Sequence, residues 1–118
     1  MRRRYEGELG ISRRTSDGAT IITAVGDIDL LSTPSLRDAI MTSVDQTESG
    51  PFVLDLTEVT FFGSAGLALL VAVHSHVTAR GDELRIVVDA NRSVIRPIEI
   101  TGLDTTLNLF HTVAEALR

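Results

Sequence analysis

An apolar segment over residues 52–77 constrains the fold of this chain more than any other part of its sequence. Residues 52–56 form a short apolar run with a single charge, the pattern of a central strand. A loop over residues 57–63 is expected next, and then a helix from Ser64 to about Ala79. The apolar stripe of this helix is Gly66, Leu69, Leu70, Val73 and Val77. The segment therefore predicts a strand, a loop and a helix that begins at Ser64, where the plain role of the serine is an N-cap.

The rest of the chain supplies further strands and helices in alternation. Before the apolar segment we expect a hairpin of strands 5–14 and 20–29 with a turn at 16–18, and then a helix 34–46 capped by Thr33. After it we expect a strand 84–88 and a helix that is capped by Asn91, runs to Gly102 and is kinked or shortened by Pro97. A strand 106–111 and a helix 112–117, opened by a capping box of Thr112 and Glu115, complete the chain. Strands joined through helices favour parallel pairing, and the hairpin adds an antiparallel pair. We predict one α/β domain over residues 1–118, with a mixed sheet and the order β-β-α-β-α-β-α-β-α.

Composition excludes several classes of function. The formal net charge of −5 argues against nucleic acid, whose phosphates are bound by an excess of Lys and Arg. The chain has no cysteine, which excludes disulfides and thiolate chemistry. Its one basic run lies within residues 1–4, which we expect to be a flexible N-terminus. No apolar run is long enough to cross a bilayer, so we expect a cytoplasmic protein that is not bound to membranes.

Catalytic and metal-binding patterns are weak. A nucleophile elbow needs a glycine two residues before the serine, but Phe62 stands there, and only His111 is remote enough in sequence to act as its base. His74 and His76 are two apart on a helix, which turns them about 200° from each other and away from a common ion. No dinucleotide or Walker glycine pattern is present. We therefore predict a protein that is not an enzyme and that needs no metal or cofactor.

Two aspartates stand at the end of the second predicted strand. Asp27 and Asp29 lie two residues apart, on one side of the backbone if it stays extended. They could bind a cation or form an acid/base pair, but without a third ligand they are better interpreted as turn formers or local caps.

Ser64 is a candidate for modification. A phosphate on its hydroxyl would carry about two negative charges beside a helix N-terminus, where the helix dipole favours them. The fold should tolerate this group, whereas a protein pressed against the same surface would have to bury it. Phosphorylation would then act on association rather than on folding.

Four motifs resemble the STAS domain family, and within it the bacterial anti-sigma factor antagonists. They are residues 26–29 (GDID), 53–61 (VLDLTEVTF), 63–67 (GSAGL) and 100–103 (ITGL). The resemblance implies that Ser64 is phosphorylated by a partner that is both a serine kinase and an anti-sigma factor. It also implies that the unphosphorylated chain binds this partner and releases the sigma factor, and that a serine phosphatase resets the switch.

The resemblance also implies where the partner binds. The expected partner-binding residues are Asp27, Asp29, Gly63, Ser64, Ala65, Gly66 and Leu67. The family pattern commonly has an aspartate at the position of Gly63, and Asp27 or Asp29 is the candidate to replace its charge. The alternative is a constitutive scaffold subunit of a signalling or transport complex, in which this surface packs permanently and Ser64 is only a cap.

Overall fold

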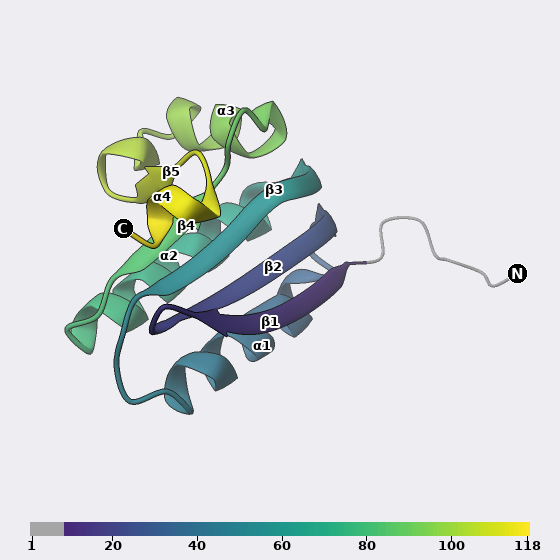
Figure 1. Cartoon of the computed structure of the whole chain (residues 1–118). Helices are drawn as coiled ribbons and strands as arrows, with labels where there is room; N and C mark the ends of the chain where they lie inside the picture. The colour runs from purple at the N-terminus through teal and green to yellow at the C-terminus, as the bar shows by residue number, and fades with distance from the viewer. Residues whose placement is uncertain (1–8) are drawn as a thin grey trace, which may run out of the picture.

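The computed structural model describes residues 9–118, which form a single five-stranded sheet with helices on both of its faces (Figure 1). The strands are β1 Gly10–Ser16, β2 Ala19–Ile28, β3 Phe52–Phe62, β4 Leu84–Val87 and β5 Asn108–Phe110. The helices are α1 Thr33–Asp45, α2 Ser64–Ala79, α3 Arg92–Ile100 and α4 Val113–Ala116, with a 3-10 turn at Leu103–Thr105. The predicted element order is confirmed. The predicted flexible residues 1–4 lie outside the described residues, as do the first four residues of the strand expected over 5–14.

The sheet is mixed, as predicted. Its strands lie in the order β1-β2-β3-β4-β5, with β1 antiparallel to β2 and every other pair parallel. Strand β2 is buried on both faces, because Ile22 and Ala24 belong to the larger core while Ala19 and Ile21 belong to the smaller one. This explains why its sequence is a nearly continuous apolar run rather than an alternating one.

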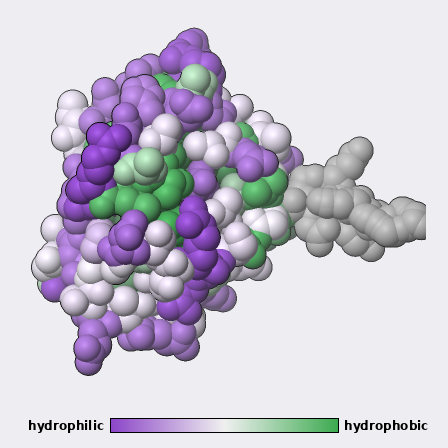
Figure 2. Space-filling view, viewed as in Figure 1, coloured by the Kyte–Doolittle hydropathy of each residue, from purple (hydrophilic) through white to green (hydrophobic). Residues whose placement is uncertain are grey.

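Two cores of unequal size fill the two faces of the sheet. The larger core lies between the sheet and the helices α1, α2 and α3, and it contains the four side chains of the predicted α2 stripe, Leu69, Leu70, Val73 and Val77. The fifth residue of the stripe, Gly66, is also buried. The smaller core lies under α4, where Ala116 packs on Val53 and Val87. Figure 2 shows this second face, on which the largest green area lies over and beside α4 and smaller ones lie near the grey residues. Within residues 9–118, no helix combines the length and the apolar composition needed to cross a membrane.

Strand β3 is longer than the sequence predicts. The predicted loop over residues 57–63 is wrong, because β3 continues to Phe62 beside β2. The pairing has two irregularities, one between Thr23 and Val25 and one between Gly26 and Asp27, and each leaves an extra residue on β3. The extra residues interrupt the alternation of buried and exposed side chains, which is why the sequence pattern did not show the strand.

The helix ends are partly as predicted. Asn91 caps α3 by accepting a hydrogen bond from the Ser93 amide at 3.1 Å, and Thr112 caps α4 by accepting one from the Glu115 amide at 3.1 Å. The Glu115 carboxylate accepts from the His111 amide at 2.9 Å, one residue earlier than in the usual capping box. Helix α3 runs through Pro97 and ends at Ile100, two residues before the predicted end.

The N-cap predicted for the first helix is wrong by one residue. Thr33 is the first helical residue of α1, and the cap position is Ser32. The Ser32 hydroxyl donates to the Asp27 carbonyl at 2.7 Å and accepts from the Asp29 amide at 2.9 Å. It therefore ties the end of β2 to the start of α1 instead of capping the helix.

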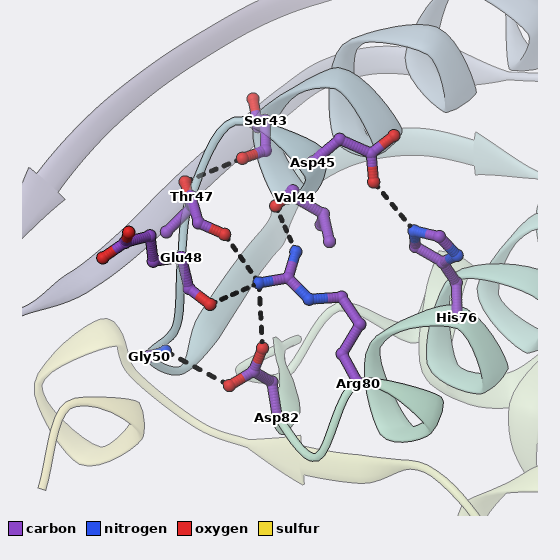
Figure 3. A network of polar contacts seen from close by, with 9 residues as sticks. All are labelled: Ser43, Val44, Asp45, Thr47, Glu48, Gly50, His76, Arg80 and Asp82. Atoms are coloured by element: carbon purple, nitrogen blue, oxygen red, sulfur yellow. Dashed lines mark hydrogen bonds and ion pairs between the residues drawn. The ribbon is translucent and has the colours of Figure 1, made fainter.

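Arg80 joins three parts of the fold (Figure 3). It is the C-cap residue of α2, at the opposite end of this helix from Ser64. Its guanidinium donates to the Val44 carbonyl, to the Thr47 carbonyl at 2.6 Å and to the Glu48 carbonyl at 2.8 Å. It also pairs with the Asp82 carboxylate at 3.2 Å, whose other oxygen accepts from the Gly50 amide at 3.2 Å. One planar side chain thus satisfies the carbonyls that α1 and the following turn leave open.

We expect Arg80→Lys to lower the free energy of unfolding by about 2 kcal/mol, although it keeps the charge. An ammonium group cannot reach three carbonyls and a carboxylate in the geometry of the guanidinium fork. Urea unfolding measures the loss, and Arg13→Lys on the exposed strand β1 is the matched control. Equal stabilities of the two variants would contradict the role given to Arg80.

Candidate functional site

The ends of two parallel strands and the start of a helix meet at one edge of the sheet. Ile28, the last residue of β2, pairs with Phe62, the last residue of β3. The Gly63 amide donates to the Ile28 carbonyl at 3.2 Å, which fixes the start of α2 beside the loop that follows β2. Residues 27–31 and 61–65 are far apart in sequence, and this pairing brings them together.

Ser64 is exposed at the first position of α2. The N-cap is Gly63, and no side chain caps the helix. The interpretation of Ser64 as an N-cap is therefore wrong, because its backbone is already helical. Within the described residues, no hydrogen bond holds its hydroxyl. The hydroxyl is open to solvent beside the positive end of a helix of 16 residues.

Gly63 is not required by its backbone conformation. Its φ of −97° and ψ of −170° are extended values that any residue can adopt. A Cβ at this position would lie 3.1 and 3.3 Å from two ring atoms of Phe61. The glycine therefore leaves room for the Phe61 ring, which lies where the side chain of an aspartate would begin.

The two aspartates have different surroundings. The Asp27 carboxylate accepts a hydrogen bond from the Thr60 hydroxyl at 2.6 Å. The Asp29 carboxylate accepts hydrogen bonds from the backbone amides of Leu31 and Ser32, each at 3.0 Å. Asp29 is therefore a turn former, as predicted. Asp29 also lines the same hollow as Ser64, whereas Asp27 is not part of that lining. Of the two, Asp29 is the carboxylate that shares a surface with the serine.

Apolar side chains that no sequence pattern singled out surround Ser64. A hollow of about 370 Å³ is lined by Leu30, Leu31 and Phe61 together with Asp29 and residues 63–65. Leu30 is 80% exposed, Leu31 is 91% exposed and Phe61 is 51% exposed. The signal in the sequence was the pair of adjacent leucines between a strand and a helix, because a contiguous exposed apolar patch indicates an interaction site.

Gly66 and Leu67 are less exposed than Ser64. Gly66 is buried, and a Cβ there would lie 2.7 Å from the Phe62 ring and 3.0 Å from Ile28. Its lack of a side chain lets the start of α2 approach β2 and β3. Leu67 is half-buried and lines a second hollow, which lies toward α3.

We expect Gly66→Ala to lower the free energy of unfolding by about 1–3 kcal/mol, because the first turn of α2 must move away from Phe62 and Ile28. Thermal unfolding measures the loss. Ala68→Gly, at an exposed position of the same helix, measures the difference in helix propensity between alanine and glycine, about 1 kcal/mol, without touching this contact. If Gly66→Ala were more stable than the wild type by that difference, the close approach would have no energetic importance.

The histidines do not extend the site. The Nε2 atom of His76 lies 3.1 Å from the Asp45 carboxylate, far along α2, and His74 has a buried Nδ1 without a partner among the described residues. His111 lies in the turn before α4. In residues 9–118 no three His, Cys, Asp or Glu side chains are grouped so that they could hold a metal ion.

Comparison with known proteins shows the family of this chain. The family model for the STAS domain matches residues 11–116. The chain belongs to the STAS domain family.

Two curated relatives align with most of the chain. An anti-sigma-F factor antagonist, RsfB of Mycobacterium tuberculosis, is 36% identical over 102 residues, which are 86% of this chain and 80% of the relative. An anti-sigma-B factor antagonist of Listeria monocytogenes is 30% identical over 108 residues, 91% of each protein.

Two solved structures have the same fold. An anti-sigma factor antagonist from Mycobacterium paratuberculosis superposes with a TM-score of 0.84 at 31% identity, covering 94% of this chain and 92% of the other. Unphosphorylated SpoIIAA, an anti-sigma factor antagonist, superposes with a TM-score of 0.75 at 16% identity over 92% of this chain and 93% of the other, a likeness of fold alone.

Proposed function

We propose that this STAS domain is an anti-sigma factor antagonist with a phosphorylation switch at Ser64. The unphosphorylated chain binds an anti-sigma factor that is also a serine kinase and thereby releases the sigma factor, and phosphorylation of Ser64 blocks this binding. The observation that carries the proposal is an exposed serine hydroxyl at a helix N-terminus, framed by the exposed side chains of Leu30, Leu31 and Phe61. The similarity to two curated antagonists supports the same function.

The geometry separates the effect of phosphate on folding from its effect on binding. At the first position of α2, a phosphate stands beside the positive end of the helix dipole, so the isolated domain tolerates it. The surrounding leucines and Phe61 are exposed in the free chain and are suited to be covered by a partner. A partner that covers them must also remove the phosphate from water, which costs binding free energy.

In this proposal the chain is a substrate and a binding protein rather than an enzyme. The kinase supplies the ATP and magnesium, and a separate serine phosphatase removes the phosphate. Asp29 supplies the carboxylate that the family pattern places at position 63, since it lines the hollow that contains Gly63 and Ser64. The transfer puts the γ-phosphoryl group on the Ser64 Oγ, with ADP leaving and the hydroxyl proton passing to a base of the kinase.

We expect Ser64→Ala to abolish phosphate incorporation while Ser75→Ala incorporates phosphate like the wild type. Ser75 is an exposed serine on the same helix, three turns from the site. The kinase is the anti-sigma factor recovered from the source cell with wild type and Ser64→Glu as paired baits. Mass spectrometry after incubation with ATP locates the phosphate. Equal incorporation by Ser64→Ala and the wild type would refute the assignment of Ser64.

The second candidate function is a constitutive scaffold subunit of a signalling or transport complex. One observation favours it, because Phe61 occupies the space in which an aspartate at position 63 would begin. A scaffold would co-purify with its partners to the same extent with and without ATP. An ATP-dependent loss of partners, absent in Ser64→Ala, would favour the switch.

A further inference from the structure

A second hollow lies on the other side of Phe61, between the end of β3, the start of α2 and helix α3. Its volume is about 510 Å³. Phe61, Phe62 and Leu67 line one side, and α3 lines the other with Pro97 and Ile100. We call this hollow the α3 groove. The proposed phosphorylation switch does not use it.

The outward face of α3 is built differently from an ordinary solvent-exposed helix face. Val94 and Ile98 turn inward and are fully buried. The opposite positions carry Arg92, Arg96 and Ile100, spaced by four residues and therefore on one face. Ile100 is 69% exposed, so a large apolar side chain at the rim of the groove is in contact with solvent.

The charge of the groove is opposite to that of the chain. Arg92 and Arg96 both line it, in a chain of formal net charge −5. Arg92 approaches Glu99 at 3.8 Å, with the two side chains 64% and 53% exposed, so this pair is weak and leaves the guanidinium available. The groove therefore combines apolar walls with positive charge at its rim.

The groove is continuous with the surface around Ser64. Phe61 lines both hollows, with Ser64 and Leu31 on one side of it and Arg96 and Ile100 on the other. A partner that covers Phe61 from the Ser64 side is thus brought to the edge of the α3 groove. The two walls end in the exposed side chains of Phe61 and Ile100. A small molecule inside the groove would leave these side chains in contact with water, whereas a polypeptide segment can cover them.

We propose that the α3 groove binds an acidic, amphipathic segment of the same protein partner. Apolar side chains of that segment pack between Phe61, Leu67 and Ile100, and its carboxylates pair with Arg92 and Arg96. The inference rests on the proposed function for the existence of a partner. It adds a second contact, in which Arg92 and Arg96 select a partner segment of negative charge. This contact does not depend on the phosphorylation state of Ser64.

The test is a double charge reversal with a matched control. Arg92→Glu with Arg96→Glu is compared with Arg13→Glu and Arg14→Glu, which make the same change of net charge on the exposed strand β1. The probe is the anti-sigma factor recovered with the wild-type bait, and calorimetry at low and physiological salt gives the dissociation constants. We expect the α3 variant to bind roughly tenfold more weakly or worse, the control to bind like the wild type, and the salt dependence to fall in the α3 variant alone.

Crosslinking gives a second readout. The chain has no cysteine, so Ser93→Cys places a single photoreactive label on the rim of the groove. Irradiation of the complex should crosslink an acidic peptide of the anti-sigma factor, identified by mass spectrometry. The same label at Ser75→Cys, an exposed position farther along α2, should not reach that peptide.

The outcomes separate this inference from the proposed function. If both double variants lowered the affinity for the anti-sigma factor equally, the loss would come from the change of net charge and not from the groove. If neither lowered it, the partner would not use the groove. In both cases the inference fails, although the proposed function stands if Ser64→Glu still disrupts the complex. A wild-type chain that sediments as a dimer, and as a monomer after Ile100→Asp, would assign the groove to a second copy and overturn the inference. If the wild type binds no anti-sigma factor at all, the proposed function fails and the inference fails with it.

Discussion

Ser64→Glu is expected to weaken binding to the partner anti-sigma factor by roughly a hundredfold, which corresponds to about 2.8 kcal/mol. The carboxylate would stand in the hollow framed by Leu30, Leu31 and Phe61, and a partner covering this surface would have to desolvate it. The free energy of unfolding should change little, because Ser64 is exposed and a negative charge is favoured at the start of α2. Calorimetric titration measures the binding, and thermal unfolding measures the stability.

The matched control for this prediction is Ser75→Glu. It introduces the same charge at an exposed position of the same helix, away from the helix N-terminus and the apolar side chains around it. We expect it to bind the anti-sigma factor like the wild type. An undiminished affinity of Ser64→Glu, or an equal loss in Ser75→Glu, would exclude an electrostatic switch at this surface. A Ser64→Glu variant that failed to fold would contradict the exposed position of the serine.

Asn91→Asp is expected to lower the free energy of unfolding by about 3 kcal/mol, the largest loss of stability that we predict for a single isosteric change. The side-chain amide of Asn91 donates to the backbone carbonyls of Leu56 at 2.9 Å, Thr57 at 3.2 Å and Val59 at 2.8 Å. The carbonyls of Leu56 and Thr57 lie within the first irregularity of β3, where the strand does not pair regularly with β2, and that of Val59 lies just after it. A carboxylate would bring a negative oxygen against three acceptors, whereas aspartate would still cap α3 through the Ser93 amide.

The control for Asn91→Asp is the same change at Asn108. The Asn108 amide donates to one carbonyl, that of Leu84, at 3.3 Å. Its replacement should cost less than about 1 kcal/mol. Urea unfolding of both variants compares the two sites directly. Similar losses at Asn91 and Asn108 would show that the contacts to the bulged strand contribute nothing special.

Elements with a clear period were predictable from the sequence. The stripe predicted for α2 is the set of its buried residues, because a helix with one face on a core repeats its apolar positions every three to four residues. The caps of α3 and α4 were also predictable, since Asn91 and Thr112 bind amides two and three residues away along the chain. Local hydrogen bonds of this kind need no knowledge of the remaining fold.

Features that depend on a distant strand were not predictable. The extension of β3 to Phe62 depends on pairing with β2, and the extra residues at its irregularities hide the alternation of period two. The cap expected at Ser64 was wrong by one position, because the Gly63 amide bonds to Ile28 and the helix starts directly after it.

The sequence by itself determined the fold class, the order of the elements, the core face of α2 and the placement of Ser64 at a helix start, because each depends on local spacing. The tertiary structure alone decided what surrounds that serine. Leu30, Leu31 and Phe61 lie beside Ser64 because β2 and β3 are parallel and end together, so the loop after β2 and the helix after β3 leave the sheet at the same edge. No local pattern encodes this meeting, since it arises from hydrogen bonds between strands that lie about thirty residues apart in the chain.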